Sequence, residues 1–174
     1  MIVASLIDAG ASFDQLNRQL DALGLHGYTL SAEKVRKQGF AATKFDVTLD
    51  ESHHHAHRHL SHIRKILDSA DIPERLKERA EAIFLKLAQA EAKVHGTTIE
   101  KVHFHEVGAI DAIIDVVSAV LAMDMLGVDR IVVSPIPTGN GTVKCDHGLM
   151  PVPAPATAER SEEHTSELQS RQVI

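Results

Sequence analysis

Half of the twelve histidines in this 174-residue chain fall between His53 and His62. Neutral imidazole is the usual nitrogen ligand for nickel, zinc, copper and iron. An extended segment would place alternate side chains of this run on one face, whereas a helix would bring His55, His59 and His62 together. Loose, redundant histidines without cysteines differ from a closed structural zinc site and suit capture and release of a labile metal. We therefore predict metal binding by His53, His54, His55, His57, His59 and His62.

The alternative for this run is a solvated polar loop. The run does not distinguish nickel from zinc, because the general order of ligand affinities favours several divalent metals.

A second group begins with the sequence His-Phe-His-Glu at residues 103–106 and continues into an apolar segment. The His-x-His spacing on a strand places both imidazoles on one side, which predicts His103 and His105 as metal ligands. An ionised carboxylate that is buried without a partner is strongly destabilising, so carboxylates on an apolar helix need a cation, a hydrogen-bond network or protonation. A favourable interaction with the helix dipole would explain Glu106 well and Asp111 partly, but not Asp115. We predict a catalytic group of Glu106, Asp111 and Asp115.

A third group lies in residues 139–148, where a Gly-Asn-Gly turn precedes Cys145 and His147. These two side chains are two positions apart, so both can face one site as metal ligands. Backbone N–H groups of Gly139 and Gly141 can approach an anion, and we group Lys144 with them as cofactor-binding. The alternative is an ordinary hairpin turn beside a buried cysteine.

Composition excludes several classes of function. The formal net charge of −6 argues against a nucleic-acid partner. A single cysteine excludes an internal disulfide and suits a reducing compartment. No apolar run approaches the roughly 18 residues of a membrane span, so we expect a cytoplasmic protein with no membrane partner.

Hydrophobic periodicity predicts an α+β fold in which helices pack on a small mixed sheet. The sheet is expected to combine the strands near 28–49 and 129–145, with the β-branched run at 131–133 buried. The expected helices lie over 1–9, 12–23, 60–67, 71–96 and 107–126. The expected strands lie over 28–35, 40–49, 102–106, 129–134 and 142–145.

Two regions of different character are expected. Residues 1–159 form one truncated domain, incomplete at its start, with a histidine-rich loop at about 50–62. Residues 160–174 are polar, lack a period and resemble the translation of a sequencing adapter, so we predict a non-native disordered tail.

The sequence His-Phe-His-Glu-Val-Gly-Ala-Ile-Asp-Ala-Ile-Ile-Asp-Val-Val at 103–117 is similar to the signature of the nickel-insertion proteins of the nickel-pincer cofactor. Residues 134–143, 147–148 and 151–157 and the histidine-rich stretch resemble the same family. The resemblance covers nearly all of residues 1–159, as the N-terminal part of such a protein.

The resemblance implies a lyase-type nickel chelatase that inserts Ni²⁺ into pyridinium-3,5-bisthiocarboxylic acid mononucleotide. It also implies CTP and a divalent metal, Mn²⁺ or Mg²⁺, both bound mainly by a part of the protein beyond Thr157. The partner that it implies is the racemase that receives the finished cofactor. Met1 matches the last residue of a family stretch Gly-Ile-Ser-Gly-Asp-Met, so the fragment is expected to be inactive alone. The sequence leaves open whether the protein forms a homo-oligomer.

Two other classes of function remain at this point. The first is a storage or delivery protein for nickel or zinc without catalysis, for which the histidine run would suffice. The second is a metal-dependent phosphate-handling enzyme that uses His103, His105, Asp111 and Asp115.

Overall fold

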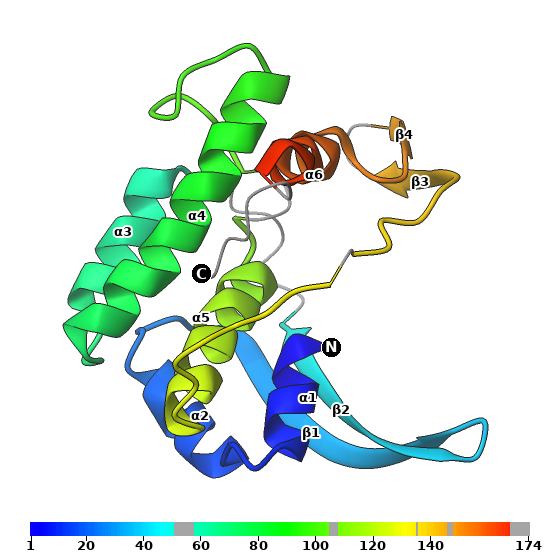
Figure 1. Cartoon of the computed structure of the whole chain (residues 1–174). Coiled ribbons are helices and arrows are strands. Elements are labelled where there is room, and N and C mark those ends of the chain that lie inside the picture. Colours follow the sequence, from blue (N-terminus) through cyan, green and yellow to red (C-terminus); the bar gives the residue numbers. More distant parts are fainter. Residues whose placement is uncertain (51–57, 105–107, 135, 146–147, 168–174) are drawn as a thin grey trace.

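The computed structural model describes residues 1–50, 58–104, 108–134, 136–145 and 148–167 (Figure 1). The chain is α+β, as predicted. Its elements in order are α1 (Ile2–Asp8), α2 (Phe13–Asp21), β1 (Tyr28–Lys37), β2 (Phe40–Leu49), α3 (Leu60–Ser69), α4 (Glu74–Val94), α5 (Ile110–Met125), β3 (Thr142–Cys145), β4 (Gly148–Pro151) and α6 (Pro155–Glu167).

Helix α5 lies at the centre of the core and contacts α1, α2, α4 and β2 (Figure 1). Most of its circumference is apolar, and it is one of the elements predicted from hydrophobic periodicity. Its buried side chains pack with those of the other helices in one continuous cluster that includes Leu16, Leu20, Ile63, Leu76, Phe84, Ile113 and Leu121. None of the helices in the described part of the chain has the length and apolar character needed to cross a membrane.

The strands predicted over 28–35 and 40–49 are confirmed. They form an antiparallel hairpin, β1 and β2, paired from Tyr28 opposite Leu49 to Lys37 opposite Phe40. Gln38 and Gly39 form the two-residue turn, with φ of 49° and 88°. Positive φ at both central residues matches the right-handed twist of the strands, and Gly adopts it without steric penalty. Alternate residues of β2 pack against the core, which fixes the face that the hairpin presents to the helices.

The prediction of a strand over residues 129–134 is wrong. This segment forms no regular element, and Ile131, Val132 and Val133 are 40%, 75% and 58% exposed. Strand β3 pairs with β4 instead, so the described residues contain two separate two-stranded sheets rather than one mixed sheet. A β-branched run forms a strand only where another strand supplies backbone partners, and no described strand lies beside it.

Helix α6 carries residues that were expected to be disordered. Its backbone is helical through Glu167, and it contacts α4, where Lys93 forms an ion pair with Glu159. The non-native origin of residues 160–174 stays a prediction.

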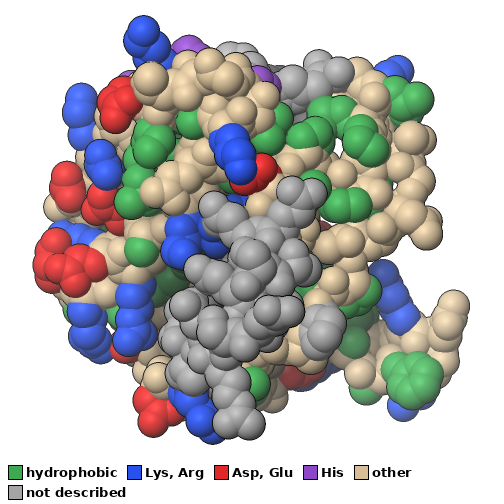
Figure 2. Space-filling view, turned by 45° about the horizontal axis from the view of Figure 1, so that its top comes forward, with side chains coloured by type: hydrophobic (Ala, Val, Ile, Leu, Met, Phe, Trp, Pro, Cys, Tyr) green, Lys and Arg blue, Asp and Glu red, His purple; other side chains and the backbone are tan. Residues whose placement is uncertain are grey.

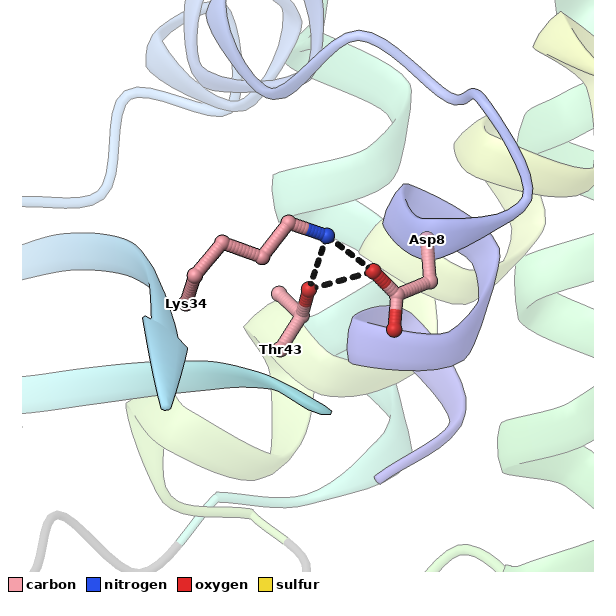
Figure 3. Close-up of polar contacts among 3 residues, drawn as sticks. All are labelled: Asp8, Lys34 and Thr43. Atoms are coloured by element: carbon pink, nitrogen blue, oxygen red, sulfur yellow. Dashed lines mark hydrogen bonds and ion pairs between the residues drawn. The ribbon is translucent and has the colours of Figure 1, made fainter. Parts of the chain in front are cut away.

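A polar cluster of Asp8, Lys34 and Thr43 joins α1 to the hairpin (Figure 3). The Thr43 hydroxyl donates to Asp8 Oδ1 at 2.6 Å, and Lys34 Nζ donates to Thr43 Oγ1 at 2.8 Å and also contacts Asp8. The Lys34 hydrogen bond, followed by that of Thr43, lowers the pKa of the Asp8 carboxyl below its ordinary 3.8.

The lowered pKa of Asp8 predicts a pH-dependent contribution to stability. Because the folded-state pKa lies below the unfolded value, the contribution is present above the unfolded pKa and disappears as pH falls through the folded pKa. Asp8→Asn should lower the melting temperature slightly at pH 7 and not at all in strong acid, since the pair is exposed. A double-mutant cycle with Lys34→Met tests this, and additive effects at pH 7 would contradict it.

Candidate functional site

The two histidine-bearing motifs meet through Arg58, which lies within the histidine run and pairs with Phe104 in an isolated antiparallel bridge. The Phe104 N–H donates to the Arg58 carbonyl at 3.0 Å, and the Phe104 ring is buried in the core. The Arg58 guanidinium donates from Nη1 to the Gly108 carbonyl at 2.8 Å. Burial lowers the pKa of this guanidinium, although an arginine remains charged at any physiological pH. Arg58 therefore contacts the chain at both Phe104 and Gly108.

Three histidines lie at this junction. The His59 and His103 ring centroids are 4.0 Å apart, with an angle of 47° between the ring planes. The His59 and His62 centroids are 5.5 Å apart, because these residues occupy the N-cap and the third position of α3. His59 Nδ1 lies 3.0 Å from the Val102 carbonyl oxygen. The structure thus places His59, a member of the histidine run, beside the 103 motif.

The site is incomplete within the described residues. Among them, no three His, Cys, Asp or Glu side chains converge as a set of metal ligands. The remaining predicted ligands His53, His54, His55, His57, His105 and His147, and the predicted catalytic Glu106, lie outside the described residues.

The premise that α5 buries two carboxylates is wrong. Asp111 and Asp115 are both exposed, and Asp111 Oδ1 accepts the Ala112 N–H at 2.9 Å. The buried polar residue of α5 is Ser118, whose hydroxyl has no hydrogen-bond partner among the described residues. A helix with one narrow solvent-facing strip can carry charges there while its other faces stay apolar, so the apolar sequence did not imply burial.

The pKa of Asp115 is nevertheless raised, first by partial burial and then by Asp111, against a lowering effect of the Met1 ammonium. A folded-state pKa above the unfolded value means that stability falls as pH rises through the unfolded pKa. We therefore expect Asp115→Asn to raise the melting temperature modestly at pH 7 and to leave it unchanged near pH 2. Thermal melts at both pH values, with Asp111→Asn as the control on the same face, check this. A fall at pH 7 would show that the carboxylate has a stabilising partner.

The third predicted group lies on the β3–β4 hairpin and the loop before it. Gly139 and Gly141 have φ of 78° and 97°, which explains both glycines by backbone conformation alone. Lys144 is exposed, and Cys145 is a half-buried free thiol at the end of β3. Gly139 and Gly141 precede β3 and so do not form the turn between β3 and β4, which leaves the alternative of a hairpin turn at these glycines unconfirmed. The cofactor-binding role of this group stays a prediction.

Sequence reasoning missed three contributors to the junction. Arg58 is the one arginine or lysine within residues 53–62. The backbone at Gly108 lies so close to Phe104 that an added Cβ atom would be 2.8 Å from Phe104 Cβ. A surface hollow of about 200 Å³ also adjoins His103 and is lined by His95, Thr97, Lys101, Val102 and His103. Histidine side chains reach the surface at the top edge of the face in Figure 2, where basic and acidic side chains are interspersed.

Comparison with known proteins assigns the chain to a family. The family model described as nickel insertion protein matches residues 1–173. The chain is 47% identical over 167 residues to the pyridinium-3,5-bisthiocarboxylic acid mononucleotide nickel insertion protein of Geobacillus kaustophilus. It is 49% identical over 159 residues to the protein of the same name from Desulfitobacterium hafniense. The chain belongs to the nickel insertion protein family.

Each of these alignments covers 91% of this chain but only 41% and 39% of the relative. The chain thus spans about two fifths of the length of these curated relatives. No solved structure matches it at a significant level.

Proposed function

We propose that the intact protein inserts Ni²⁺ into pyridinium-3,5-bisthiocarboxylic acid mononucleotide. The observation that carries this proposal is the identity of 47–49% to relatives named for that insertion, over nine tenths of the chain. The contact between the histidine run and the 103 motif supports it, because it gathers nitrogen ligands of two motifs at one place.

The predicted residues divide into three roles in this proposal. The run from His53 to His62 captures the metal, and His103 and His105 receive it. Nickel in the product is bonded to a ring carbon, so a ring C–H must lose its proton, and a carboxylate of Glu106, Asp111 or Asp115 is suited to accept it. Gly139, Gly141 and Lys144 contact an anionic group, with Cys145 and His147 as further ligands.

The finer parts of the proposal concern the whole protein. They are a lyase-type reaction that uses CTP with Mn²⁺ or Mg²⁺, a racemase that receives the cofactor, and a cytoplasmic location that suits the single cysteine. The part of the protein outside these residues is proposed to bind most of the nucleotide.

The competing function is storage or delivery of nickel or zinc without catalysis. It is distinguished by incubating the full-length parent with the thiocarboxylate precursor, Ni²⁺ and CTP and measuring the nickel-bound cofactor by mass spectrometry. Product that requires CTP supports insertion, whereas nickel binding without product supports storage. Residues 1–174 are assayed in parallel, with the expectation that they bind nickel and form no product.

The histidine run makes a prediction of its own. Changing His53, His55, His57 and His59 together to Ala should remove most of the nickel uptake of the chain. Binding to the unchanged chain should weaken as pH falls through about 6.5, because protons compete for the imidazole nitrogens. Calorimetry at two pH values measures both effects, with His26→Ala, on the loop before β1, as the control. Unchanged uptake in the fourfold variant would exclude the run.

A further inference from the structure

The His59 ring lies against a backbone carbonyl. Its Nδ1 is 3.0 Å from the Val102 carbonyl oxygen, which can only accept a hydrogen bond. A proton on Nδ1 makes this contact a hydrogen bond and, in the neutral ring, leaves the lone pair on Nε2. A hydrogen bond from one ring nitrogen to a backbone carbonyl is also the usual support of a metal-binding histidine.

His62 has the opposite arrangement. Its Nδ1 accepts the backbone N–H of His59 at 3.3 Å, so in the neutral ring the proton is on Nε2. This contact satisfies one of the free N–H groups at the start of α3. His62 is thus occupied as a helix cap, and neither of its nitrogens offers a free lone pair in this arrangement.

His103 completes a pair with His59. The rings are 4.0 Å apart between centroids, and His103 directly follows Val102, whose carbonyl orients His59. The bridge between Arg58 and Phe104 fixes the chain on both sides of this contact. His103 is exposed and borders the hollow of about 200 Å³, which Lys101 also lines.

We propose that His59 and His103 together bind one Ni²⁺ ion, separately from the residues at 53–57 and without His62. Two imidazole nitrogens would leave the other coordination positions to water or to an anionic ligand in the hollow beside Lys101. An open coordination sphere suits a metal that must be passed on. The proposal rests on the geometry of the pair and does not depend on the insertion reaction.

The test isolates the pair from the rest of the run. In the full chain with His53, His54, His55 and His57 changed to Ala, Ni²⁺ alone is titrated by calorimetry at pH 7.5. One equivalent should still bind. His59→Asn keeps a helix-capping side chain but removes the imidazole, and His103→Gln removes the second one. Each substitution should weaken nickel binding at least about tenfold, because the loss of a residue that merely orients a metal ligand already has an effect of about this size.

The control is His26→Asn, on the loop before β1, which should leave the nickel affinity unchanged. His62→Asn alters the cap of α3 and should lower the nickel affinity less than His103→Gln does. Thermal melts confirm that each variant is folded. No residual nickel binding in the fourfold background, or equal losses from His62→Asn and His103→Gln, would overturn the proposal. Because the measurement is of metal binding, either result leaves the insertion reaction to be judged by formation of the nickel-bound cofactor.

Discussion

Phe104→Ala is expected to destabilise the chain by about 3–5 kcal/mol, the usual range for removing a buried aromatic ring. Phe104 is 1% exposed and belongs to the continuous core cluster, although it lies between the two histidines of a predicted metal site. Its backbone is also tied to Arg58. The ring therefore anchors the 103 motif in the core, while its neighbour His103 faces solvent.

Urea unfolding of Phe104→Ala and Phe40→Ala measures this effect. Phe40 is 78% exposed at the hairpin turn, so its truncation should change stability by no more than about 0.5 kcal/mol. Similar losses in the two variants would show that Phe104 does not contribute to the core as described. We also expect the nickel affinity of the His59 and His103 pair to fall in Phe104→Ala alone.

The elements that could be predicted from sequence are those determined by near neighbours. The helix after Ser12 begins where expected, because the Ser12 hydroxyl accepts the Gln15 N–H at 3.3 Å, a contact over three residues. The hairpin turn at Gln38 and Gly39 likewise depends on two adjacent backbone conformations. Such features leave a signal in the residue types themselves.

Strand pairing left no comparable signal. Residues 131–133 and the strand Thr142–Cys145 both have β-branched residues, yet only the second pairs with another strand. Whether a run joins a sheet depends on a partner elsewhere in the fold, which a single run of residues does not specify. The same limit applies to the strand expected over 102–106, of which the described residues 102–104 form only the bridge at Phe104.

The candidate site could be predicted as residue types but not as an arrangement. The histidines were evident from composition, and the meeting of His59 with His103 was not, because it follows from the backbone pairing of Arg58 with Phe104. The distinction between His59 and His62 depends on a hydrogen bond to the Val102 carbonyl, a tertiary contact. Burial of Asp115 was inferred from its apolar neighbours, and the position of the residue on the helix surface decided otherwise.

Gly108→Ala is expected to destabilise the chain by about 1–3 kcal/mol through overpacking. A Cβ atom at this position would lie 2.8 Å from Phe104 Cβ, 2.9 Å from the Phe104 carbonyl oxygen and 3.3 Å from Arg58 Cβ. None of these atoms is the free end of a flexible side chain, so the backbone on one side of the junction must move. Because the same residues position His59 and His103, the substitution should weaken nickel binding to that pair as well.

Gly24→Ala is the matched control for this variant. Gly24 has φ of 64° and no atom within 4 Å of an added Cβ, so the substitution introduces backbone strain of about 1–2 kcal/mol without a clash. The two variants should therefore lose comparable stability in urea unfolding, whereas only Gly108→Ala should lose nickel affinity in the background without His53, His54, His55 and His57. Equal nickel affinities in the two variants would show that the close contact at Gly108 supports the fold alone and does not position the histidine pair.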